Sequence, residues 1–267
     1  MTDSPTIDPS ATDSRPDSEA TAADGAGVAR RLEEIRRRIA AACQRVGRDP
    51  AEVTLVGASK SQPLERLVAA ACAGLVVFGE NRVQEAEEHR AALEAALGAE
   101  AAARLRWHLI GPLQSNKAKL AAQLFDAVES VDRGKIARAL ERELAARERR
   151  VPAWLEVNLG GEVSKHGFPA AGLAEAVRPL AALEHLRVGG LMVIPPPGET
   201  PEDSRPWFRR ARALRDELAA LPEWRGRLTG LSMGMSDDFE VAVEEGATHV
   251  RVGSALFGPR RAVPTGD

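Results

Sequence analysis

Short apolar segments alternate with longer charged segments along nearly the whole chain, and this alternation limits the folds that it can adopt. The short segments have the length of buried strands, and the longer ones repeat apolar residues at helical spacing. Strands that alternate with helices predict a parallel sheet with helices packed outside it. We expect eight strands, over residues 53–58, 75–78, 106–110, 127–131, 153–158, 187–193, 228–232 and 249–252.

Eight strand–helix units in a chain of this size predict an α/β fold with a single (β/α)8 TIM barrel. An extra N-terminal helix over 29–46 precedes the first strand. The other expected helices cover residues 63–73, 83–97, 116–124, 134–149, 170–183, 203–220 and 238–245. An open, doubly wound sheet is the alternative. However, no G-x-G-x-x-G motif follows the first strand, where Gly57-Ala58-Ser59 leads into Lys60 instead.

The barrel is expected to form one domain over residues 27–260. Residues 1–26 are rich in Asp, Ser, Thr, Pro and Ala and contain hardly any large apolar side chain. Burial of such a segment cannot offset the entropy cost of ordering it. We therefore expect a disordered N-terminal tail over 1–26 and a loose C-terminal tail over 261–267.

The net charge of −3 gives no basic field of the kind that binds nucleic acid. No apolar run reaches the roughly 18 residues of a membrane span, and the N-terminal segment lacks the basic start and apolar core of a secretory signal. We therefore expect a cytoplasmic protein. The charged helices leave no large apolar stripe on the surface, which favours a monomer. No cluster of His, Cys or Asp in the sequence has the spacing of metal ligands.

Lys60 closes the first expected strand, in a chain where only five of the 36 basic residues are lysines. Arginine stays protonated, whereas a desolvated lysine amine can lose its proton and condense with an aldehyde. Lys60 is therefore a candidate Schiff-base residue for an aldehyde cofactor. A lysine that merely caps a strand in solvent is the alternative.

Two turns rich in Gly and Ser follow the last two expected strands. They are Ser232-Met233-Gly234-Met235-Ser236 and Gly253-Ser254, and each precedes a helix. Glycine lets backbone amides approach a ligand, serine adds a hydroxyl donor, and a helix N-terminus favours an anion. Because barrels commonly bind phosphate at their last two loops, these turns predict a phosphate site. A tight turn with a helix cap is the alternative.

Arg251 lies two residues before Gly253, so both residues share one face of the last strand. If that face lines the pocket, a guanidinium beside a pyridine nitrogen would keep the nitrogen unprotonated. An aldehyde with a phosphate and a pyridine ring is pyridoxal 5′-phosphate (PLP). An arginine at the barrel rim paired with a carboxylate is the alternative.

The motifs together resemble the family of pyridoxal phosphate homeostasis proteins, which have the alanine racemase N-terminal-domain type of barrel. The matching segments are 56–60, 78–85, 107–117, 128–132, 157–158, 164–168, 190–192, 231–239 and 251–258. Arg82 and Leu109 depart from the pattern, since aromatic residues are frequent there in the family.

The resemblance implies a PLP-binding barrel that stores, buffers or delivers the cofactor, with apo PLP-dependent enzymes as recipients. It implies that Lys60 forms the Schiff base, that Arg251 contacts the pyridine nitrogen and that Asn81 lies near the ring, as does His108 or a neighbour. It also implies phosphate contacts from Ser232, Gly253 and Ser254. No residue is assigned a catalytic role.

An amino-acid racemase on the same barrel is the alternative function. Racemases that the barrel resembles use the Schiff-base lysine on one face of the substrate and a tyrosine from the partner subunit on the other. This chain contains no tyrosine, and it ends soon after the eighth expected strand, which leaves no room for the extra β-domain. We therefore favour a carrier over a racemase with another base.

Three further residues carry additional hypotheses. His108 could act as a base, but a buried and hydrogen-bonded histidine is the favoured interpretation on an apolar strand. Lys165 lies in a glycine-rich loop and could engage a second PLP molecule transiently. Lys117 follows a Gly-Pro turn, and we expect it to be solvated.

Overall fold

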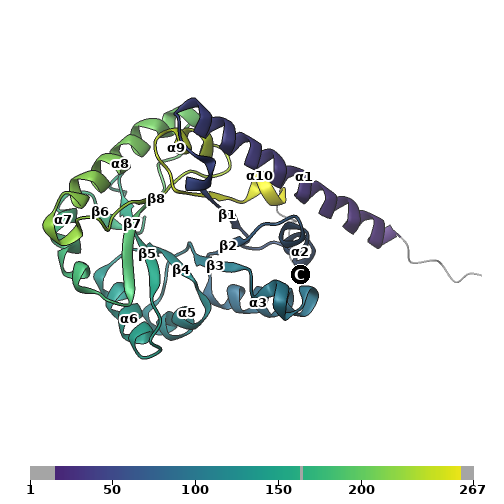
Figure 1. Cartoon of the computed structure of the whole chain (residues 1–267), viewed down its shortest axis with the longest axis horizontal. Helices are drawn as coiled ribbons and strands as arrows, with labels where there is room; N and C mark the ends of the chain where they lie inside the picture. Colours follow the sequence, from purple (N-terminus) through teal and green to yellow (C-terminus); the bar gives the residue numbers. More distant parts are fainter. Residues whose placement is uncertain (1–15, 163–164, 260–267) are drawn as a thin grey trace, which may run out of the picture.

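Eight parallel strands form a closed barrel in the computed structural model, which describes residues 16–162 and 165–259. Figure 1 shows the strands at the centre and the helices around them. The barrel strands are β1 (Thr54–Ala58), β2 (Val77–Glu80), β3 (Arg106–Leu109), β4 (Ala127–Val131), β5 (Val151–Asn158), β7 (Leu186–Val193), β8 (Gly230–Ser232) and β9 (His249–Val252). This confirms the predicted barrel and all eight strands.

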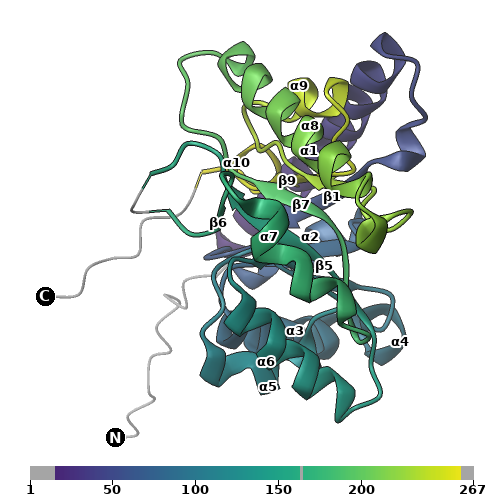
Figure 2. The ribbon, with the colours of Figure 1, turned by 90° about the vertical axis from the view of Figure 1, so that its left-hand side faces the viewer.

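The order of the strands explains how the barrel closes. Each strand pairs in parallel with the next one along the chain, and β9 pairs with β1. A further short strand, β6 (Phe168–Pro169), pairs with the carboxyl end of β5 and was not predicted. Figure 2 shows β6 on the same side of the barrel as the short helix α10 (Ser254–Phe257), which follows β9.

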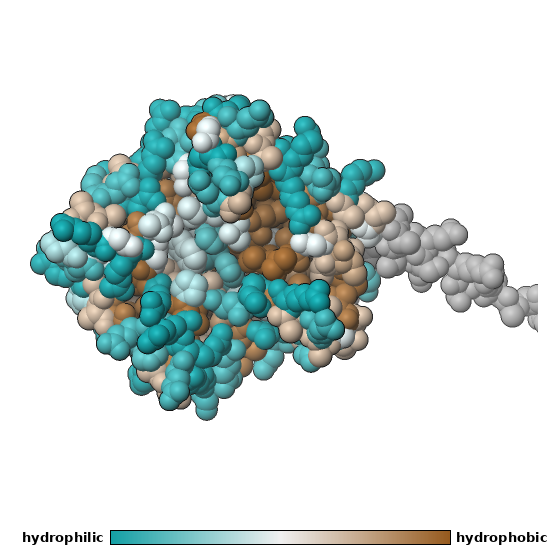
Figure 3. All heavy atoms as spheres, viewed as in Figure 1, coloured by the Kyte–Doolittle hydropathy of each residue, from teal (hydrophilic) through white to brown (hydrophobic). Residues whose placement is uncertain are grey.

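The helices lie between the strands in the chain and cover the outside of the barrel. They are α2 (Leu64–Cys72), α3 (Val83–Leu97), α4 (Ala99–Ala102), α5 (Ala118–Leu124), α6 (Gly134–Ala145), α7 (Leu173–Val177), α8 (Arg205–Ala219) and α9 (Phe239–Glu244). The helix expected over 170–183 is divided into α7 and the 3-10 helix η3 (Arg178–Ala182), because Pro179 lacks the amide that would continue an α-helix. Figure 3 shows hydrophilic side chains over these outer helices on one face.

Helix α1 (Pro16–Arg45) precedes the barrel and begins earlier than expected. The helix includes residues 16–26, which were assigned to the N-terminal tail in the sequence analysis. An ion pair of 2.7 Å between Asp24 and Arg66 of α2 fixes this part of α1 to the barrel, and Val28 is fully buried. Residues 1–15 and the C-terminal tail at 261–267 lie outside the described residues.

Apolar side chains fill the layer between strands and helices, whereas the barrel interior holds several polar ones. Phe78, Leu109 and Phe208 are fully buried in the outer layer. Glu129 and Ser232 are also fully buried, but their hydrogen bonds lie within the barrel. Within the described part of the chain, no helix is long and apolar enough to cross a membrane.

Candidate functional site

A pocket of about 320 Å³ brings together the turns that follow several barrel strands. Because β1 pairs with both β2 and β9, the turns after these three strands are neighbours. Of the residues predicted for the site, Lys60, Asn81, Arg251, Gly253 and Ser254 line this pocket. The other lining residues are Ala58, Gln62, Ile110, Ile194, Met235, Ser236, Asp237 and Gly258.

Lys60 lies in a half-buried position two residues beyond the end of β1 at Ala58. Its neighbours fix the turn: Ser59 donates hydrogen bonds to Gly79 O (3.2 Å) and to Glu80 Oε1 (2.5 Å). The Ser61 amide donates to the Glu85 carboxylate, and Ser61 has a positive φ of 55°. Across residues 16–162 and 165–259, Lys60 Nζ forms no hydrogen bond or ion pair. Its amine is therefore available to a ligand in the pocket.

Two backbone amides of the last turn converge on one oxygen atom. The amides of Gly253 and Ala255 donate to Ser236 Oγ, at 3.3 Å and 3.2 Å. A side chain at Gly253 would contact Ala58 at 3.4 Å, so this backbone lies close to the end of β1. The turn therefore presents backbone amide donors of the kind that bind an anionic oxygen. Ser236 belongs to a segment that the sequence highlights, but it was not selected as a site residue.

Ser232 is the predicted site residue that does not line the pocket. It is fully buried in β8, donates to Glu129 Oε2 (2.5 Å) and accepts a hydrogen bond from Arg251. The strand directs its side chain into the barrel interior, whereas the loop after the strand reaches the pocket. Ser232 was expected to contact phosphate, whereas its hydroxyl bonds to Glu129 and Arg251 in the structure. Ser236, four residues later, lines the pocket.

Arg251 lines the pocket and is buried. It donates to the Ser232 hydroxyl and to Val193 O (3.0 Å), and the side chain is only 5% exposed. Burial lowers the pKa of Arg251, although an arginine remains charged in proteins. Arg251 forms no ion pair with a carboxylate among the described residues, so the rim ion pair considered as the alternative is absent there. Its hydrogen bonds to Ser232 and Val193 fix the position of the guanidinium.

A hydrogen-bonded network continues from Arg251 and Ser232 into the barrel interior. His108 Nδ1 lies 2.6 Å from Glu129 Oε1, which confirms the interpretation of His108 as a buried, hydrogen-bonded histidine. Burial would raise the pKa of Glu129, but the hydrogen bond from His108 and the charge of Arg251 lower it to about 2. The carboxylate is therefore ionised and holds His108 and Ser232 together. This network was not predicted from the sequence, although Glu129 is a carboxylate within the otherwise largely apolar strand β4.

Asn81 lies between the lysine pocket and a second pocket of about 510 Å³. Residues that line the second pocket include Arg82, Lys117, Arg133 and His166. Lys117, which was expected to be solvated, is half-buried there. Lys165 is not among the residues that line either pocket. Its amine forms an ion pair with Glu162 Oε1 at 2.6 Å, and residues 163–164 beside it lie outside the described part of the chain.

The fold and the lysine pocket define a class of protein, the (β/α)8 barrels of the alanine racemase N-terminal-domain type. The family model described as "Alanine racemase, N-terminal domain" matches residues 31–261. Solved alanine racemases share this fold. One from Corynebacterium glutamicum aligns with a TM-score of 0.57 at 19% identity, over 88% of this chain and 64% of its own.

More similar relatives identify the particular family. A pyridoxal phosphate homeostasis protein of Aquifex aeolicus is 43% identical over 231 residues, which are 86% of this chain and 97% of the relative. The Escherichia coli K12 protein of the same name is 40% identical over 233 residues, 87% of this chain and 97% of its own. The chain belongs to the family of pyridoxal phosphate homeostasis proteins.

Solved structures include one family member both with and without the cofactor. PipY of Synechococcus elongatus without PLP aligns with a TM-score of 0.74 at 39% identity, over 86% of this chain and all of PipY. PipY with PLP bound aligns with the same TM-score at 38% identity and the same coverage.

Proposed function

We propose that this chain binds PLP in the Lys60 pocket and acts in cytoplasmic PLP homeostasis, by storing, buffering or delivering the cofactor. One observation carries the proposal: the Lys60 amine and the amides of the last turn lie in the same pocket. No residue in the described part of the chain forms a hydrogen bond or an ion pair with that amine. Names of relatives at 40–43% identity and the PLP-bound PipY structure support it.

The residues of the pocket fit the three chemical groups of PLP. Gly253, Ser254 and Ser236 would hold the phosphate, because they offer amide and hydroxyl donors beside the end of β9. Arg251 would donate to the pyridine nitrogen, and Asn81 would lie beside the ring. Lys60 would hold PLP through its amine, because the cofactor would supply an aldehyde that condenses with a primary amine and releases water. A half-buried site of about 320 Å³ has the size of a small-ligand pocket.

A carrier fits the chain better than a racemase does. The chain contains no tyrosine, so no copy of it could supply a tyrosine as the second base. His108 does not fill that role, because it is not among the residues that line the Lys60 pocket. We propose that the chain works as a monomer and transfers PLP to apo PLP-dependent enzymes.

An absorption spectrum of the full chain tests PLP binding. The wild-type protein should be yellow as purified or after addition of PLP, and Lys60→Ala should lose the colour. Lys119→Ala is the matched control, because Lys119 is an exposed lysine outside the pocket. A wild-type protein that stays colourless with added PLP would rule out the proposal.

Two assays on the same preparation separate the carrier from the racemase. We expect the loaded protein to reactivate a PLP-free apo-enzyme, and we expect amino acids incubated with it to keep their chirality. Robust racemisation by the wild-type chain would overturn the carrier function while leaving PLP binding intact.

A further inference from the structure

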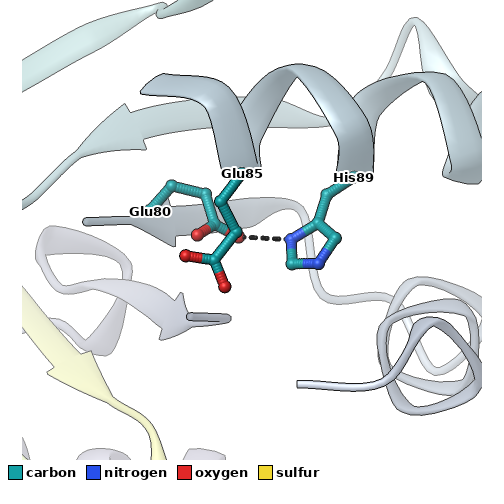
Figure 4. Close-up of side chains that lie close together, drawn as sticks. All are labelled: Glu80, Glu85 and His89. Carbon is teal, nitrogen blue, oxygen red and sulfur yellow. Dashed lines mark hydrogen bonds and ion pairs between the residues drawn. The ribbon is translucent and has the colours of Figure 1, made fainter. Parts of the chain in front are cut away.

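Glu80, Glu85 and His89 gather directly behind the turn that carries Lys60. Glu80 is the last residue of β2, and Glu85 and His89 lie one helical turn apart on α3, so they share one face of the helix. Ligand atoms of the three side chains lie within 4.8 Å of one another. Figure 4 shows the two carboxylates and the imidazole converging on the same space.

The charges in this cluster are incompletely balanced. Glu80 is fully buried; its Oε1 lies 2.7 Å from His89 Nδ1, and its Oε2 is buried without a hydrogen-bond partner. Glu85 accepts a hydrogen bond from the Ser61 amide. No Lys or Arg within residues 16–162 and 165–259 forms an ion pair with Glu80 or Glu85. Burying a carboxylate oxygen without a hydrogen-bond donor or a cation costs free energy. A cation bound at Glu80 Oε2 would therefore stabilise the cluster.

We propose that Glu80, Glu85 and His89 form a binding site for a divalent transition-metal ion. Two carboxylates and one imidazole are ligands that Zn²⁺ accepts in proteins, and the imidazole disfavours Mg²⁺ and Ca²⁺, which prefer oxygen alone. Three protein ligands leave a coordination position for water, so this is an exchangeable site rather than a closed structural one.

The site is joined to both residues that flank Lys60. Ser59 donates to Glu80 Oε1, and the Ser61 amide donates to Glu85. Fixing the two carboxylates on a cation therefore also fixes the Lys60 turn, in which Ser61 holds an uncommon positive φ of 55°. This link belongs to the chain itself and needs no PLP in the pocket.

Isothermal titration of the chelator-treated full chain with Zn²⁺ tests the site. We expect the wild type to bind Zn²⁺ at one site that weakens by about tenfold or more in Glu85→Gln and in His89→Gln, since each loses one ligand. Glu88→Gln should bind as the wild type does, because Glu88 is exposed on the same helix outside the cluster. Circular dichroism verifies that each variant is folded. Absence of Zn²⁺ binding by the wild type, or equal binding by folded Glu85→Gln and His89→Gln, would overturn the proposal.

Amide hydrogen exchange tests the link to the Lys60 turn. Peptides that contain Ser61 should exchange more slowly in the wild type with Zn²⁺ than without it, by about threefold or more. The same peptides of His89→Gln should not respond to Zn²⁺. An unchanged exchange rate in a wild-type protein that has bound Zn²⁺ would overturn this link.

Discussion

Ser232 donates a hydrogen bond of 2.5 Å to Glu129, although the two residues are 103 positions apart in the chain. The same carboxylate binds His108, and the same hydroxyl accepts from Arg251. The contact therefore links the barrel interior to the guanidinium that lines the lysine pocket. In this way the packing of the barrel determines where Arg251 points.

Glu129→Gln should strongly destabilise the fold. The amide cannot carry the charge that Arg251 and His108 face, and it replaces one acceptor oxygen with a donor. We expect the free energy of unfolding to fall by about 3 kcal/mol, as for other broken buried charge networks. Urea unfolding followed by circular dichroism measures it. Glu87→Gln, at an exposed position, should change it by about 0.5 kcal/mol at most. A loss that small in Glu129→Gln would contradict the proposed role of the network.

Stability should fall in mild acid because of His249. Burial lowers the pKa of His249 to about 4, from 6.5. The unfolded chain therefore binds a proton at this position below about pH 6.5, while the folded chain stays neutral until about pH 4. The stability is complete above pH 6.5 and declines as the pH falls toward 4, by about 3 kcal/mol in total.

Urea unfolding of the wild type and of His249→Gln at several pH values measures this decline. The variant should lose most of the pH dependence in this window. The contribution of Glu129 lies at lower pH, because its folded pKa is about 2 and its stabilisation is lost only as the pH falls from about 4.5 toward 2. Parallel pH profiles of wild type and variant would show that another group titrates.

Ser236→Ala and Ser232→Ala should have different effects. Ser236 lines the pocket and receives two amides of the last turn, so its loss should weaken PLP binding by about 1 kcal/mol, or about fivefold. Ser232 lies in the barrel interior, so its loss should lower stability by about 1–3 kcal/mol and change PLP affinity less. PLP titration and urea unfolding of both variants measure these effects. If Ser232→Ala lost more PLP affinity than Ser236→Ala, the result would support the direct contact between Ser232 and phosphate that the sequence predicted.

Gly190→Ala should disrupt the barrel, whereas Gly189→Ala should be tolerated. A Cβ at Gly190 would lie 2.2 Å from Gly230 O and 2.7 Å from the Trp154 ring, but one at Gly189 would have no neighbour closer than 4.0 Å. We expect Gly190→Ala to cost about 3 kcal/mol or more, because neighbouring strands and a buried indole cannot move apart freely. Thermal unfolding compares the two variants. Equal melting temperatures would show that the strands β7 and β8 can separate.

The fold could be predicted from the sequence because each strand and helix has its own local pattern. Each of the eight apolar runs became a barrel strand, since burial on both faces leaves few other structures for such runs. The helical extension over 16–26 was missed, because composition does not show that Asp24 pairs with Arg66. The short strand β6 was also missed, since its two residues carry no pattern.

The candidate site could be predicted in part. Lys60 and Gly253 lie after strands that are neighbours only because the barrel closes, so predicting closure also predicted that they meet. The roles of Ser232 and Ser236 depend on where β8 ends, and one residue of shift reverses the direction of a side chain. The cluster of Glu80, Glu85 and His89 was not expected. It requires the contact between β2 and α3, which the spacing within α3 alone does not reveal.

Mapping the attachment site of PLP tests the central claim most directly. The full chain is loaded with PLP, reduced with borohydride to fix the Schiff base, digested and analysed by mass spectrometry. We predict that the label of the wild type lies on Lys60. In Lys60→Ala, no remaining lysine should carry more label than the exposed lysines of the wild type carry. A label on Lys165, or one spread evenly over the five lysines of the wild type, would contradict this prediction.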